Sequence, residues 1–111
     1  CVDDSQRCLA ERKAALESIM RDKSRGWVAR PATAGTYASG VRLFAFMKLK
    51  RQLSCRELAS GLAEAQQARS VLRAAKASLT PAQISRGALL GDEVASHMQR
   101  EMRRRGCRQR A

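Results

Sequence analysis

The chain has 111 residues, a size that suits one domain around one hydrophobic core. It carries 22 Lys and Arg against 10 Asp and Glu, a formal net charge of +12, and such repulsion within a compact protein predicts an anionic partner. Alanine, leucine and arginine dominate and aromatic residues make up 4% of the chain, which favours helices over sheets. No apolar run reaches the roughly eighteen residues that a membrane-spanning helix needs.

The first half of the chain predicts two helices, over residues 4–25 and 36–53. Asp3, Asp4 and Ser5 offer side-chain oxygens to the free amides at the first helix start, and Gly26 is expected to end that helix in the left-handed conformation. Pro31 indicates a linker over residues 26–35. The second helix is apolar most of the way round, although Arg42 interrupts it, and we expect it to supply the centre of the core. Its apolar residues are Tyr37, Val41, Leu43, Phe44, Phe46, Met47, Leu49 and Leu53.

Two longer helices are predicted in the second half, over residues 55–79 and 81–105. Ser54 and Glu57 form a capping box that opens the first of them. Thr80 and Gln83 repeat the capping device, with Pro81 at the first helical position, where its missing amide costs nothing. Gly106 is expected to end the last helix. A basic tail follows over residues 103–111.

The cysteine positions predict how these two helices pair. Helices of similar length joined by a tight turn form an antiparallel hairpin, and its two open ends then bring Cys55 beside Cys107. A disulfide needs Cα atoms within about 7 Å, which this hairpin provides. The sequence therefore predicts an all-α fold, a four-helix up-and-down bundle or a pair of helical hairpins, disulfide-stapled at one end. In such a bundle all four cysteines would gather at one pole.

Cys1 and Cys8 leave alternatives open, because four cysteines allow three pairings. We expect Cys1–Cys8 with Cys55–Cys107 first and Cys8–Cys55 with Cys1–Cys107 second. In a third arrangement Cys1 is the lipid-bearing residue of a bacterial lipoprotein and one thiol is free, which fits a chain whose leader has been removed. Reduced thiols in a cytosolic protein and a zinc site are further alternatives. Zinc ligands usually come in pairs two to four residues apart, so no metal or other cofactor is predicted.

The densest group of charges predicts a binding patch for multivalent anions. Arginine's planar guanidinium can hold a phosphate or a carboxylate through two bonds at once. In the predicted bundle ten cations lie at one pole, although some of them could only cap the last helix carbonyls. These are Lys48, Lys50, Arg51, Arg56, Arg100, Arg103, Arg104, Arg105, Arg108 and Arg110.

The chain's one histidine offers little for catalysis. Glu93 and Glu101 lie one turn to either side of His97, and we expect a solvated stripe of ion pairs with Arg100 rather than a metal site. One histidine cannot supply the usual sets of general acids and bases. No catalytic residue is predicted.

These observations predict a non-enzymatic exported accessory or structural subunit, periplasmic or extracellular and anchored to a membrane through Cys1 if that residue is lipidated. We expect it to dock through its basic face onto an acidic protein partner or, failing that, an anionic envelope or membrane surface. Nucleic acid fits less well, because the sequence holds no helix-turn-helix or finger motif and disulfides indicate an oxidising compartment. The alternatives are a cytosolic nucleic-acid-binding helical protein with reduced cysteines and a small secreted effector, toxin or immunity protein.

Overall fold

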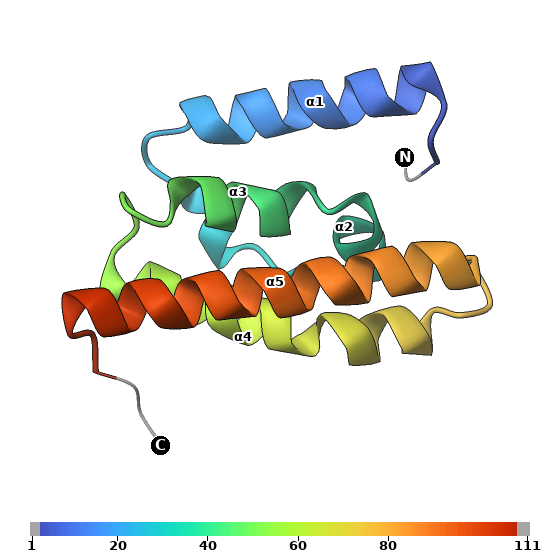
Figure 1. Cartoon of the computed structure of the whole chain (residues 1–111). Helices are drawn as coiled ribbons and strands as arrows, with labels where there is room; N and C mark the ends of the chain where they lie inside the picture. The colour runs from blue at the N-terminus through green and yellow to red at the C-terminus, as the bar shows by residue number, and fades with distance from the viewer. Residues whose placement is uncertain (1–2, 109–111) are drawn as a thin grey trace.

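The computed structural model describes residues 3–108, which fold entirely into helices and turns and form three layers (Figure 1). The first layer is α1 (Gln6–Arg21), and a single 3-10 turn, η1 (Gly26–Ala29), follows it. The middle layer holds α2 (Ala34–Ser39) and α3 (Val41–Leu49). The third layer is the hairpin of α4 (Cys55–Ala74) and α5 (Pro81–Arg105). The prediction of an all-α fold is confirmed.

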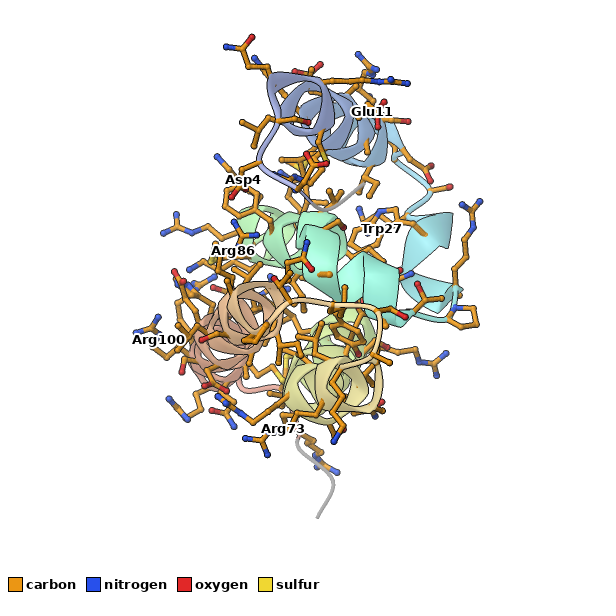
Figure 2. The ribbon with its side chains drawn as sticks, turned by 90° about the vertical axis from the view of Figure 1, so that its right-hand side faces the viewer. Asp4, Glu11, Trp27, Arg73, Arg86 and Arg100 are labelled. Carbon is orange, nitrogen blue, oxygen red and sulfur yellow. A yellow bond between two sulfur atoms is a disulfide. The ribbon has the colours of Figure 1, made fainter. Side chains whose placement is uncertain are left out.

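The order of helix directions differs from the predicted up-and-down bundle. Figure 1 shows α1, α3 and α5 running the same way and α4 running against them. The chain between α1 and α3 travels back along the molecule through η1 and α2 before α3 begins, so α1 and α3 become parallel. The start of α1 therefore lies beside the start of α5, where Arg86 pairs with Asp4 at 2.8 Å (Figure 2).

Side-chain caps explain where the longer helices begin. Ser5 accepts a hydrogen bond from the amide of Cys8 at 3.1 Å and starts α1. Both predicted capping boxes are present in the hairpin, since Ser54 and Glu57 start α4 and Thr80 and Gln83 start α5. The last helix has the predicted bounds, because local signals define both its ends.

The predicted helix 36–53 is wrong, because the chain breaks there into α2 and α3. Gly40 takes the left-handed conformation, with φ of +74°, and serves as the end of α2 and the start of α3. Its backbone lies close to Leu90, so that a Cβ at this position would come within 2.9 Å of the Leu90 Cδ2 atom. A third capping box, of Thr33 and Thr36, was not predicted and starts α2 inside the expected linker.

Two other predicted helix ends also need correction. The first helix stops at Arg21 instead of residue 25, and Arg25 rather than Gly26 takes the left-handed conformation, with φ of +52°. The Arg25 side chain donates to Glu57 of α4 at 2.8 Å, which holds the pKa of that carboxyl below its usual range and ties the loop to the hairpin. The predicted helix 55–79 ends at Ala74, and residues 75–80 form the hairpin turn.

The hairpin owes its close packing to small residues that face one another across α4 and α5. A Cβ on Gly91 would come within 2.7 Å of the Ala68 Cβ and 2.9 Å of the Ala65 carbonyl oxygen. A Cβ on Gly87 would come within 2.5 Å of Leu72. The two backbones thus approach more closely than larger side chains would permit.

The core lies between the middle layer and the hairpin. Phe46 of α3 is fully buried and contacts the Trp27 ring edge to face, with 4.8 Å between ring centroids. Leu43, Leu49 and Leu53 are buried as predicted, while Phe44 is only half-buried because it faces the space beside α1.

A buried ion pair that was not predicted from the sequence joins the middle layer to the hairpin. Arg42 of α3 donates to both carboxylate oxygens of Glu64 on α4, at 2.5 and 3.1 Å, and to the Arg30 carbonyl at 2.8 Å. The two side chains are only 9% and 11% exposed. Tyr37 donates to the Glu64 carbonyl at 2.8 Å, and burial raises the pKa of its hydroxyl. Arg42 is therefore a structural residue inside an apolar helix.

Candidate functional site: a basic pole beside the disulfide

The predicted disulfide closes the open end of the hairpin. Cys55 is the first residue of α4, and Cys107 follows the left-handed Gly106 that ends α5. Their Cα atoms lie 5.6 Å apart and the sulfurs are bonded. The pairing of Cys55 with Cys107 agrees with the sequence prediction.

The prediction that all four cysteines share a pole is wrong for Cys8. This residue is fully buried near the start of α1, at the far end of the molecule from the Cys55–Cys107 disulfide. The described cysteines are all disulfide-bonded and carry no free thiol. Cys1, which the sequence analysis pairs with Cys8, lies outside the described residues.

The disulfide end of the molecule collects most of the cations predicted to bind anions. We call this end the basic pole and define it by its residues: Lys50, Arg51, Arg56, Arg100, Arg103, Arg104, Arg105 and Arg108. The end of α3, the start of α4 and the end of α5 meet here (Figure 1). Arg110 was also predicted to belong to this patch but lies outside the described residues.

Arg105 is already committed to the fold. Its guanidinium donates to the carbonyl oxygens of Lys50 and Leu53, in the turn between α3 and α4. It also donates to Glu101 at 2.8 Å. Arg105 thus fastens the end of α5 to the turn that precedes Cys55, and it is not free to hold a ligand.

Glu101 is the carboxylate that anchors this end of α5. It is 5% exposed and accepts hydrogen bonds from Arg104 and Arg105. The bonds from Arg104 and then Arg105 lower the pKa of Glu101 from 4.5 to about 2. Because the folded pKa is depressed, the stabilisation from this carboxylate is complete above about pH 4.5 and is lost as the pH falls towards 2. The expected solvent-exposed stripe of Glu93, His97 and Glu101 is therefore wrong at Glu101.

Two lysines predicted for the patch also have neighbours within the fold. Lys50 lies 2.8 Å from His97 Nδ1, and since an ammonium group only donates, the ring nitrogen accepts. Burial, and then the charges of Lys50 and Arg100, lower the pKa of His97, so the ring is neutral at pH 7. Lys48 lies over the Phe44 ring at 5.5 Å and lines a hollow with Leu16 and Met20 of α1. Lys48 therefore lies beside Phe44 and α1 and is not counted among the residues of the basic pole.

Five arginines of the basic pole remain without a carboxylate. We call them the open arginines: Arg51, Arg56, Arg100, Arg103 and Arg108. All five are exposed, and none lies within 4.0 Å of a carboxylate in the part of the chain that the structure describes. The two acids near them, Glu57 and Glu101, already pair with Arg25, Arg104 and Arg105. The positive charge of the open arginines is therefore available to a ligand.

A hollow of about 630 Å³ adjoins the open arginines, on the side of the hairpin that faces away from α3. Arg56 and Arg108 line it together with Cys55, and its floor includes Leu62 and Met102. The hollow was not predicted from the sequence, because its lining combines residues of α4 and α5 that are far apart along the chain.

Comparison with known proteins adds no identification: no family model, curated protein or solved structure matches this chain. Within residues 3–108, no three His, Cys, Asp or Glu side chains are grouped closely enough to share a metal ion. The same residues contain no helix with the length and apolar character to cross a bilayer. The geometry of the basic pole is therefore the basis for a functional proposal.

Proposed function

We propose that this protein is a non-enzymatic accessory subunit that docks onto an acidic protein through the open arginines. The observation that carries the proposal is that five exposed arginines share one end of the molecule without any carboxylate beside them. Arginines are enriched in protein interfaces because one guanidinium can bind a carboxylate through two hydrogen bonds and also pack against apolar atoms.

The backbone that carries these arginines is held in place by covalent and hydrogen bonds, which favours binding by a preformed surface. Arg56 and Arg108 are sequence neighbours of Cys55 and Cys107, whose disulfide joins the ends of α4 and α5. Arg105 bonds the same region to the turn at Lys50 and Leu53. A surface fixed in this way loses little conformational freedom when it binds, which leaves more of the interaction free energy for affinity.

An acidic protein suits this surface better than a nucleic acid, because a hollow with both apolar and polar side chains in its lining adjoins the charges. Leu62 and Met102 contribute to that hollow next to Arg56. Protein interfaces combine apolar contacts with a charged rim, whereas non-specific nucleic-acid binding depends on phosphate contacts alone. The disulfide supports the further proposal that the protein is exported to the periplasm or the extracellular space.

A matched pair of triple variants tests the proposal. The first neutralises the open arginines Arg51, Arg100 and Arg103 to Gln, and the second neutralises Lys13, Arg73 and Lys76, exposed cations away from the basic pole, to Gln. The affinity for poly-L-glutamate is then measured at low and moderate salt. Each lost contact is worth about 0.5–1 kcal/mol, so the first variant should bind about tenfold or more weakly, and the second should bind nearly as the parent protein does.

Three results would contradict the proposal. Equal losses in both triple variants would mean that net charge alone attracts the polymer. Full affinity in the Arg51, Arg100 and Arg103 variant would remove the basic pole from the interaction. Tighter binding to duplex DNA than to poly-L-glutamate at the same salt would favour the nucleic-acid alternative.

A further inference from the structure

The hollow beside the basic pole has the dimensions of a site for a short helix. It follows α4 from Cys55 to Gln66, a length of about 16 Å at 1.5 Å per residue, and its volume is about 630 Å³. A helix of three turns, about eleven residues, has the same length. Ala59 and Ala63 lie one turn apart on α4, and their small side chains let a second helix approach closely.

The side chains that line the hollow also define the chemistry of an occupant. Leu62 is half-buried and offers apolar contact, Met102 is buried and offers little, and Arg56 and Arg108 also line the hollow. No carboxylate is among the described residues that line it. An occupant should therefore carry apolar side chains on one face and carboxylates beside them.

The charge of the protein disfavours a second copy of this chain as the occupant. Each chain has a net charge of +12, so two basic poles brought together would repel one another. The opposite sign on a partner would instead speed and orient its approach.

We propose that this hollow is a groove that binds one amphipathic, acidic helix of the partner protein. The helix places apolar residues, spaced three and four apart, against Ala59, Leu62 and Ala63, while its flanking carboxylates pair with Arg56 and Arg108. This proposal rests on the proposed function, because it assigns the partner a particular element and gives that element a binding site.

Two tryptophan variants separate groove binding from general charge attraction. Ala63→Trp fills the middle of the groove without changing the charge, and Ala74→Trp makes the same change at the exposed end of α4 outside it. The probes are two peptides of about twelve residues, with identical Leu and Glu content. In one the leucines recur at helical spacing, and in the other they are scattered around the helix.

The parent protein should bind the amphipathic peptide at least tenfold more tightly than the scattered peptide. Ala63→Trp should abolish that preference, and Ala74→Trp should retain it. The groove proposal would be contradicted if the parent protein bound both peptides equally. It would also be contradicted if Ala63→Trp kept the preference for the amphipathic peptide.

The two proposals fail in different ways. The groove proposal could fail while the affinity for both peptides still falls when Arg51, Arg100 and Arg103 become Gln. In that case the basic pole remains a binding surface that acts by charge alone. If neither peptide nor poly-L-glutamate binds, both proposals are wrong.

Discussion

The α4–α5 hairpin and α1 are helices of the same protein held by different means. In the hairpin seven residues of α5 and five of α4 are buried, and glycines bring the two backbones into contact. In α1 only Cys8 is buried, and Leu9 and Met20 remain 48% and 37% exposed. A helix that packs along one neighbour depends on few apolar contacts, so we expect α1 to open locally more often than the hairpin.

Charge separates the same two regions. Residues 1–22 contain five acids and four bases, whereas residues 23–111 contain five acids and 18 bases. At the start of α1 Asp4 faces both Arg12 and Arg86, so acids there have partners (Figure 2). At the opposite end of the molecule the open arginines have none. A nearly neutral region and a strongly basic region thus coexist in one small chain, and the proposed partner is assigned to the basic one.

The largest loss of stability is expected when the middle layer loses its ion pair with the hairpin. Arg42→Met leaves the Glu64 carboxylate buried without its ion-pair partner, and we expect a loss of about 3–5 kcal/mol in the free energy of unfolding. Urea denaturation measures it. Arg69→Met, which removes an exposed pair with Asp92, should cost less than about 1 kcal/mol, and equal effects would contradict the structural role of Arg42.

Removal of the disulfide should weaken the hairpin more than α1. The bond spans 52 residues, and a loop of that size stabilises a fold by up to about 4 kcal/mol, so Cys55→Ser with Cys107→Ser should lose about 2–4 kcal/mol. Hydrogen exchange should accelerate most at the two ends that the bond joins. An unchanged denaturation midpoint, with unchanged exchange near residues 55 and 105, would show that the hairpin closes without the bond.

The glycine contact can be tested with a single methyl group. Gly91→Ala places a Cβ 2.9 Å from the Ala65 carbonyl, so α4 and α5 must separate, at a cost of about 1–3 kcal/mol. Gly35→Ala is the matched control, because its nearest neighbour would be 3.8 Å away. The melting temperature of Gly91→Ala should be lower than that of the parent protein, and that of Gly35→Ala should be close to it. The reverse order would contradict the close approach of α4 and α5 at Gly91.

The smallest effect is expected in α1. Leu9→Ala removes a side chain that is already half exposed, so the loss should be below about 1 kcal/mol, while Leu72→Ala in the hairpin should cost about 2–5 kcal/mol. Hydrogen exchange of the α1 amides should be faster than that of α5 in the parent protein. Similar losses of unfolding free energy in the two variants would mean that α1 and the hairpin are held with equal stability.

Local signals were enough to predict the hairpin from the sequence. Ser54, Thr80 and Gly106 act on backbone groups within a few residues of themselves, and the bounds of α5 follow from them. The predicted lengths of the two helices then bring Cys55 to Cys107 without knowledge of the remaining chain, although α4 ends at Ala74 rather than at residue 79. These features depend on short sequence distances, which a single sequence reveals well.

The remaining fold depends on contacts between distant residues. Gly40 breaks the predicted helix where its backbone lies against Leu90, and Arg25 takes the left-handed position while its side chain reaches Glu57. The apolar pattern around Arg42 gave no sign that this residue forms an ion pair with Glu64 of α4. Such partners become visible only when the layers are assembled.

The sequence indicates which end of the hairpin carries the candidate site, but it does not indicate which arginines there are free to bind a ligand. Net charge cannot show which arginines are already paired. The spacing of Glu101 from Arg104 and Arg105, three and four residues, was the one signal that could have removed these two from the predicted patch. The hollow beside Leu62 is lined by residues of both α4 and α5, which no local pattern records.

The position of the Cys55–Cys107 bond has a practical consequence for proteolysis. Lys76 lies in the exposed turn at the other end of the hairpin, so a trypsin cut there would separate α4 from α5 in sequence. The two fragments would stay covalently linked and would migrate as one band on a non-reducing gel. A reducing agent would release two bands, so that a nicked sample can pass for intact material until it is reduced.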